Sequence, residues 1–121
     1  MTGMLVPERR VAFSGPKGVL VRQTLLDTGA SQAALPEVDA ERLGIRTQYT
    51  EPVHTDGGVV SWGVGEVNIS LDGETWHKVD LWIVPPQDPA PPTLGWAALT
   101  RVGFNLTPPS RATTYPEVLE E

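Results

Sequence analysis

The chain has 121 residues, of which 15 are acidic and nine are basic, and it carries a formal net charge of −6. This length suits a single domain, and the acidic balance argues against nucleic acid or an anionic membrane as a partner. The absence of cysteine excludes disulfides, thiolate metal sites and cysteine nucleophiles.

Twelve glycines and twelve prolines, with charged residues at only 20%, indicate a loop-rich β protein and not a helical bundle. No segment approaches the roughly 20 apolar residues of a membrane span. The first eight residues also lack the basic start and the apolar run of a signal peptide. We therefore expect no membrane partner and a cytoplasmic location.

The first predicted elements form a hairpin. Residues 1–8 are expected to be an extended arm. Residues 10–14 and 19–26 have strand composition, and the stretch 15–18, with its glycines and proline, predicts the turn between them. The second strand ends directly before an aspartate, Asp27.

Asp27 begins the segment in which we expect chemistry. A carboxylate that emerges from an apolar strand into a tight turn is partly desolvated, so nearby N–H or O–H groups have to stabilise its charge. Thr28 supplies a hydroxyl, and Gly29 lets a substrate or another chain come close to the main chain. Ala30 and Ser31 continue this uncrowded surface.

The remaining elements are predicted in a regular order. Residues 35–45 predict a short helix, with Pro36 in its first turn and Gly44 at its end. The other predictions are a strand over 46–53, a hairpin over 54–63 that turns at Gly57 and Gly58, a strand over 64–71, a turn at Asp72 and Gly73, a return strand over 74–84, a rigid Pro-rich connection over 85–92, and a flexible tail over 108–121.

Two features together resemble a known family. The run Leu25-Leu26-Asp27-Thr28-Gly29-Ala30-Ser31 resembles the aspartic peptidase signature, and Leu94-Gly95 resembles the Leu-Gly that opens a late short helix in the retropepsin-like branch. The resemblance covers roughly residues 9–107, which we take as the domain. It implies an all-β fold, namely the closed β-barrel lobe of the acid proteases with a flap hairpin and one or two short helices.

The resemblance also implies an activity, the hydrolysis of peptide bonds in extended polypeptides by an aspartic endopeptidase. Asp27, Thr28 and Gly29 take the catalytic positions. The mechanism needs two carboxylates that share one proton, and the chain has one Asp-Thr-Gly. The resemblance therefore implies a homodimer with its active site on the two-fold axis, with residues 4–6 and 104–106 as candidates for an intersubunit sheet.

Two segments are expected to bind the peptide or protein substrate, which would lie extended in the site. They are the turn with Gly29, Ala30 and Ser31, and the flap hairpin with Asp56, Gly57, Gly58, Val59 and, as an apolar cover, Trp62. In the mechanism that the resemblance implies, the two carboxylates activate the water that attacks the peptide bond. We therefore expect neither a metal nor another cofactor.

Two departures from the viral pattern belong together. Ser31 stands where many viral members have a second Asp, and Trp96 stands where they have an Arg. Those two charges pair in the family, so their joint absence removes a charge pair without leaving one buried charge alone. The chain is in this respect more similar to cellular or bacterial members than to viral proteases.

Other interpretations are weaker. A retropepsin-like domain that no longer cleaves, and instead binds peptides as a dimeric module, would be favoured by a substituted Asp27, which is intact here. An unrelated small β-barrel would require the late Leu-Gly and the Gly-rich hairpin to be coincidental. His54 and His77 lack metal-ligand spacing, and Ser31 has no adjacent His base.

Overall fold

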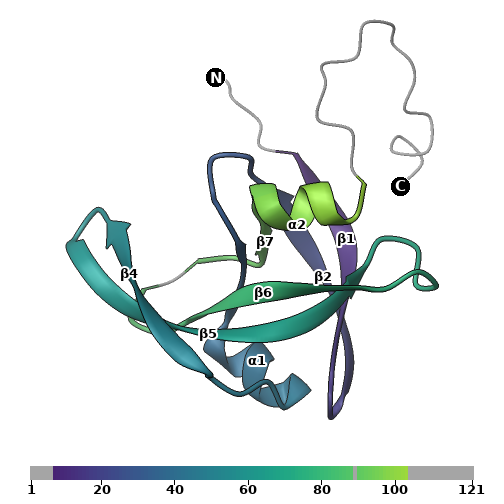
Figure 1. The fold of residues 1–121 in the computed structure, drawn as a ribbon, viewed down its shortest axis with the longest axis horizontal. Coiled ribbons are helices and arrows are strands. Elements are labelled where there is room, and N and C mark those ends of the chain that lie inside the picture. The colour runs from purple at the N-terminus through teal and green to yellow at the C-terminus, as the bar shows by residue number, and fades with distance from the viewer. Residues whose placement is uncertain (1–6, 89, 104–121) are drawn as a thin grey trace, which may run out of the picture.

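The computed structural model describes residues 7–88 and 90–103. This part of the chain contains seven strands and two short helices (Figure 1). They are β1 Glu8–Gly15, β2 Gly18–Leu26, β3 Ala33–Pro36, α1 Glu37–Leu43, β4 Tyr49–Thr55, β5 Gly58–Ser70, β6 His77–Val84, β7 Thr93–Leu94 and α2 Trp96–Arg101. Neither helix has the length and apolar character needed to cross a membrane.

The strands form one sheet that closes on itself. Its order is β1-β2-β7-β3-β6-β5-β4, and β1 also pairs with β5, from Ala12 opposite Ser70 to Ser14 opposite Asn68. The β2–β7 and β3–β6 pairs are parallel, and the other pairs are antiparallel. Because β1 pairs on both sides, the sheet has the ring arrangement of a barrel. This confirms the predicted all-β lobe, from which the β4–β5 hairpin extends at the left of Figure 1.

The first hairpin is the predicted one. β1 and β2 pair from Glu8 opposite Leu25 to Gly15 opposite Gly18, with the turn at Pro16 and Lys17. β2 therefore ends at Leu26 and delivers Asp27 at the end of a strand that is paired along its whole length.

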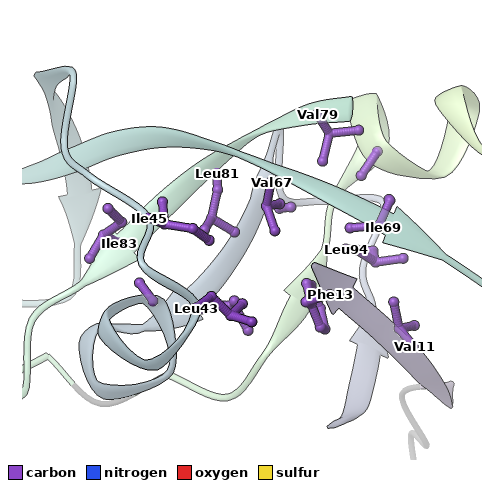
Figure 2. Close-up of a cluster of buried hydrophobic side chains, with 14 of the residues drawn as sticks. Val11, Phe13, Leu43, Ile45, Val67, Ile69, Val79, Leu81, Ile83 and Leu94 are labelled. Atoms are coloured by element: carbon purple, nitrogen blue, oxygen red, sulfur yellow. The ribbon is translucent and has the colours of Figure 1, made fainter. Parts of the chain in front are cut away.

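A core of buried apolar side chains fills the ring (Figure 2). Phe13, Leu35, Ile69, Leu81 and Leu94 come from five different strands, and each is 0% exposed. Burying one side chain of this size contributes about 1.5–3 kcal/mol. Apolar contacts in this core thus hold the strands that carry the candidate site.

The ends of α1 follow from single residues. Pro36 precedes the helix with a φ of −58°, which the proline ring favours, and Gly44 ends it in the left-handed conformation with a φ of +77°. Asp39 of this helix is buried and pairs with Arg22 of β2 through two contacts, Nη2 to Oδ1 at 3.1 Å and Nε to Oδ2 at 3.3 Å. This bidentate ion pair links the helix to the strand that leads to Asp27.

The predicted helix over 35–45 was wrong at its start. Ala33–Pro36 forms β3, and the helix begins only at Glu37. β3 pairs in parallel with β6, from Ala33 opposite Leu81 to Pro36 opposite Val84. These long-range pairings decide the conformation of a segment whose own composition favours a helix.

The division between the hairpin over 54–63 and the strand over 64–71 was also wrong, because β5 runs without a break from Gly58 to Ser70. Gly63 and Gly65 lie within it. A Cβ at these positions would lie 2.6 Å from Thr47 Oγ1 and 2.6 Å from the Arg46 carbonyl oxygen, respectively. The two glycines therefore serve the close approach of a neighbouring segment and do not end the strand.

Smaller differences concern strand starts. β4 begins at Tyr49 and not at residue 46, and β6 begins at His77 and not at residue 74. The predicted intersubunit strands at residues 4–6 and 104–106 lie outside the described residues, as does the predicted tail over 108–121.

Candidate active site

Asp27 is held in place by the strand that precedes it and by β7. Leu25 lies opposite Thr93 and Leu26 opposite Leu94 in a parallel pair. The pairing continues one residue further, because the Asp27 N–H donates to the Leu94 carbonyl at 3.0 Å. The backbone N–H of Asp27 is thus bonded to β7, directly after the end of β2.

The turn after Asp27 has two internal hydrogen bonds. The Gly29 N–H donates to Asp27 Oδ1 at 2.8 Å, and the Ala30 N–H donates to the Asp27 carbonyl at 3.0 Å. The first bond orients the carboxylate. Asp27, Thr28 and Gly29 are all exposed, and in the described part of the chain Asp27 has no ion pair. The carboxylate is fixed in direction but open to a partner group.

The late Leu-Gly supports this turn from the other side. The Trp96 N–H donates to the Ala30 carbonyl at 2.7 Å, and the Ala97 N–H donates to the Ser31 carbonyl at 3.1 Å. A Cβ on Gly95 would lie 2.5 Å from the carbonyl oxygens of both Ala30 and Gln32. Glycine is therefore required at position 95, because no side chain fits where α2 begins beside the Asp27 turn.

The hairpin between β4 and β5 has its turn at Asp56 and Gly57. The Gly57 N–H donates to Thr55 Oγ1 at 3.2 Å, and the same hydroxyl donates to the Gly58 carbonyl at 2.9 Å. Gly58 begins β5 with a φ of +111°, which disfavours any other residue. Asp56, Gly57, Gly58 and Val59 are all exposed, and Val59 reaches 60%.

Trp62 does not lie at this tip. It is 9% exposed and packs with Ala34, Val53 and Val84 in a second small cluster. Its ring meets that of Trp82 edge to face, with 5.6 Å between the centroids. The exposed apolar residue at the tip is Val59, whereas Trp62 packs in the small cluster at the base of the hairpin. A substrate contact by Trp62 stays a prediction.

Sequence reasoning missed a polar bridge between the hairpin and the Asp27 loop. Glu51 of β4 accepts two hydrogen bonds on Oε1, from Trp82 Nε1 at 2.7 Å and from Gln32 Nε2 at 3.1 Å. Trp62 Nε1 similarly donates to Asp88 Oδ2 at 3.1 Å. The available signal was the tryptophans themselves, since a largely buried indole N–H needs an acceptor. Which carboxylate supplies it depends on the fold.

Asp56 and Asp72 also lie in Asp-Gly turns. In the described part of the chain, no hydrogen bond or strand pairing joins either of them to Asp27. Asp56 lies in the hairpin turn. Asp72 Oδ1 accepts from the Thr75 and Glu74 N–H groups, each at 2.8 Å, and from Ser70 Oγ at 3.0 Å. These bonds, the backbone ones foremost, lower the pKa of Asp72 to about 2. Asp72 is a turn residue, as its sequence context predicts.

The described part of the chain contains no cluster of three or more His, Asp or Glu side chains that would hold a metal ion. His54 lies on β4 and His77 at the start of β6. What the arrangement provides is a single oriented carboxylate, a main chain accessible at Gly29 and a hairpin with an exposed glycine turn.

The family comparison agrees with this arrangement. A family model described as aspartyl protease matches residues 12–98, a span that includes both the Asp27 turn and Gly95. Among solved structures, EIAV protease complexed with the inhibitor HBY-793 is similar, with a TM-score of 0.64 and 23% sequence identity over 88% of this chain and 99% of that chain. No curated protein matches. The shared architecture and the family match together show that the chain belongs to the aspartyl protease family and has the retropepsin-like fold.

Proposed function

We propose that this protein is an aspartic endopeptidase that works as a homodimer, with Asp27 of each copy contributing one carboxylate to a shared site. The observation that carries the proposal is the Asp27 turn. Its carboxylate is exposed and is oriented by the Gly29 N–H at 2.8 Å, yet it has no ion pair in the described part of the chain. Such a group is suited to form one half of a carboxylate pair.

The second carboxylate has to come from another copy, because the sequence has one Asp-Thr-Gly. Asp39 pairs with Arg22, Asp72 is held in its turn, and Asp88 accepts from Trp62. A two-fold axis beside Asp27 brings two identical turns together. Two carboxylates at short range cannot both ionise easily, so the pair holds one proton and titrates as a unit.

This shared proton gives the site a base and an acid. A water lies between the two Asp27 side chains, and the ionised carboxylate takes its proton as the water oxygen attacks the peptide carbonyl carbon. The protonated carboxyl donates a hydrogen bond to the developing oxyanion. When the intermediate collapses, the C–N bond breaks and the leaving nitrogen takes a proton from the pair.

The substrate is an extended peptide. The turn with Gly29, Ala30 and Ser31 lies on one side of it, with main chain accessible at Gly29, and the hairpin turn from Asp56 to Val59 covers it on the other. A hairpin of this kind excludes bulk water and supplies backbone hydrogen bonds when it closes. Its exposed position, with Val59 at 60%, supports this role.

Cleavage of a complex peptide mixture across a pH series, with the native chain beside Asp27→Asn, tests the proposal. Asparagine keeps an oxygen that accepts the Gly29 N–H, so the turn is retained while the proton-transfer group is lost. We expect the native chain to cleave and the variant to lose at least about 100-fold in rate. Mass spectrometry of the products then gives the residues preferred around the cleaved bond.

Circular dichroism and sedimentation of both proteins serve as controls for fold and oligomeric state. If the folded, dimeric native chain cleaves nothing, the proposal fails and the alternative, a peptide-binding module, is favoured. If Asp27→Asn cleaves as fast as the native chain, Asp27 is not the catalytic carboxylate.

A further inference from the structure

One large aromatic side chain lies exposed directly beside the Asp27 turn. Trp96 begins α2 and is 51% exposed, whereas Ala98 and Leu99 of the same helix are 0% and 1% exposed and carry its packing. A single exposed apolar residue is ordinary on a protein surface. The place of Trp96, and not its exposure alone, makes it informative.

The backbone of Trp96 is rigidly tied to the turn. Its N–H donates to the Ala30 carbonyl at 2.7 Å, and Gly95 before it has no room for a side chain against Ala30 and Gln32. Figure 1 shows the N-terminal end of α2 beside the loop that joins β2 to β3. The backbone of Trp96 is therefore fixed to Ala30, which follows Asp27 by three residues in the sequence.

Apart from Asp27 itself, the exposed residues of the turn are small and uncharged, and so is the neighbour of Trp96. Thr28, Gly29 and Ser31 are exposed on the turn, and Ala97 is exposed next to Trp96. The cores of protein interfaces are depleted in charge and enriched in aromatic residues, and tryptophan is among the commonest residues that dominate binding energy. This composition fits a partner protein surface better than free solvent.

The proposed function decides which partner that is. In the proposed function a site with one carboxylate is incomplete until a second copy brings its own Asp27 to the same place, so exposed residues next to the Asp27 turn are candidates for contact with the second copy. We propose that the indole of Trp96 is an anchor of the homodimer and packs against the second copy beside the two-fold axis. This inference rests on the proposed function, and symmetry gives each dimer two such anchors.

The test compares Trp96→Ala with Trp76→Ala. Trp76 is the matched control because it is also exposed, at 38%, but lies on the loop that joins β5 to β6. Sedimentation velocity over a range of concentrations gives the dimer dissociation constant of each protein. We expect Trp96→Ala to raise this constant by at least about 30-fold, and Trp76→Ala to leave it within about twofold.

Peptidase activity adds a second readout. The specific activity of Trp96→Ala is expected to fall at low protein concentration and to return to the native value when enough protein is present to form dimers. Trp96→Phe, which keeps an aromatic ring, is expected to restore most of the dimer affinity. Thermal unfolding of each variant checks that the monomer stays folded. If Trp96→Ala does not fold, Trp96→Gln takes its place in the comparison.

Each outcome bears on the proposal. Unchanged dimerisation in Trp96→Ala overturns it while leaving the proposed peptidase intact. Equal weakening by Trp76→Ala overturns it as well, because the effect is then general to exposed tryptophans. A native chain that stays monomeric at millimolar concentration removes both this inference and the proposed function.

Discussion

Two aspartates in tight turns show how the same residue type takes two different roles. Asp72 Oδ1 accepts three hydrogen bonds within its own turn, whereas Asp27 Oδ1 accepts one, from the Gly29 N–H. Both residues are exposed. Asp72 is therefore held by more donors than Asp27, whose carboxylate is left accessible for the proposed chemistry.

The acidity of Asp72 gives a prediction at this scale. Its pKa is lowered to about 2 in the folded protein, against an ordinary value of 3.8. The ionised carboxylate therefore stabilises the folded state at pH values above 3.8. This contribution is lost as the pH falls through the range from 3.8 to about 2. NMR titration of the Asp72 carboxyl carbon is expected to give a midpoint near 2.

Ser70→Ala provides the comparison. Ser70 Oγ donates to Asp72 at 3.0 Å, and removing the hydroxyl is expected to move the pKa of Asp72 upward toward 3.8, while the two backbone donors keep it below that value. In Asp72→Asn, thermal stability is expected to fall less steeply between pH 4 and pH 2 than in the native chain. A native midpoint at 3.8 would contradict the role given to the three donors.

At the scale of elements, the polar bridge from Glu51 joins the β4–β5 hairpin to the Asp27 loop. Glu51→Ala removes the acceptor of both Trp82 Nε1 and Gln32 Nε2, and we expect it to lower the free energy of unfolding by about 1–2 kcal/mol. Amide hydrogen exchange in the hairpin should also become faster, because β4 loses its link to the residues that follow the Asp27 turn.

Glu51→Gln keeps one acceptor oxygen and is expected to recover much of this loss. Glu66→Ala is the matched control. Glu66 is exposed on β5, and its only ion pair in the described part of the chain is to Lys78 at 4.0 Å, so its removal should change urea unfolding by about 0.5 kcal/mol or less. Equal effects of Glu51→Ala and Glu66→Ala would contradict the bridge.

The elements themselves show where local sequence is sufficient. The β1–β2 hairpin and Asp27 at its end were predictable, because an apolar run, a Gly-Pro turn and a small-residue turn all agree. β3 was not, because Ala33–Pro36 becomes a strand only through its pairing with β6. Gly63 was likewise predicted to end a hairpin, although both Gly63 and Gly65 lie within β5 and make room for the Arg46 and Thr47 segment.

Some residues of the candidate site could likewise be predicted from local sequence, and others could not. The turn from Asp27 to Ser31 and the glycine of the late helix were visible as local patterns, because their roles depend on backbone conformation and close approach. Glu51, Gln32 and Asp88 were not, since an acceptor for an indole N–H is chosen by which strands become neighbours. Trp62 was predicted at the flap surface, and its packing against Trp82 follows from that same pairing.

At the scale of the whole molecule, a single lobe holds a complete core but half of the proposed chemistry. The closed sheet buries its apolar side chains within one chain, so a folded monomer is expected to exist. In the proposed mechanism, by contrast, activity requires a second copy. Folding and catalysis are thus expected to respond differently to concentration: thermal stability stays measurable on dilution, whereas specific activity falls as dimers dissociate.

Mixing two forms of the chain tests this directly. A fixed amount of native protein is combined with an equal amount of Asp27→Asn, at concentrations well above the dimer dissociation constant and after time for the subunits to exchange. Random pairing then places half of the native chains opposite an inactive partner, so peptidase activity is expected to fall to about half of that of the native protein alone. Asp27→Asn is suited to this role because its amide oxygen still accepts the Gly29 N–H and the turn can pair normally. An activity that does not change on mixing would mean that each lobe cleaves by itself. An unrelated protein of equal mass, added at the same concentration, controls for competition by a second polypeptide.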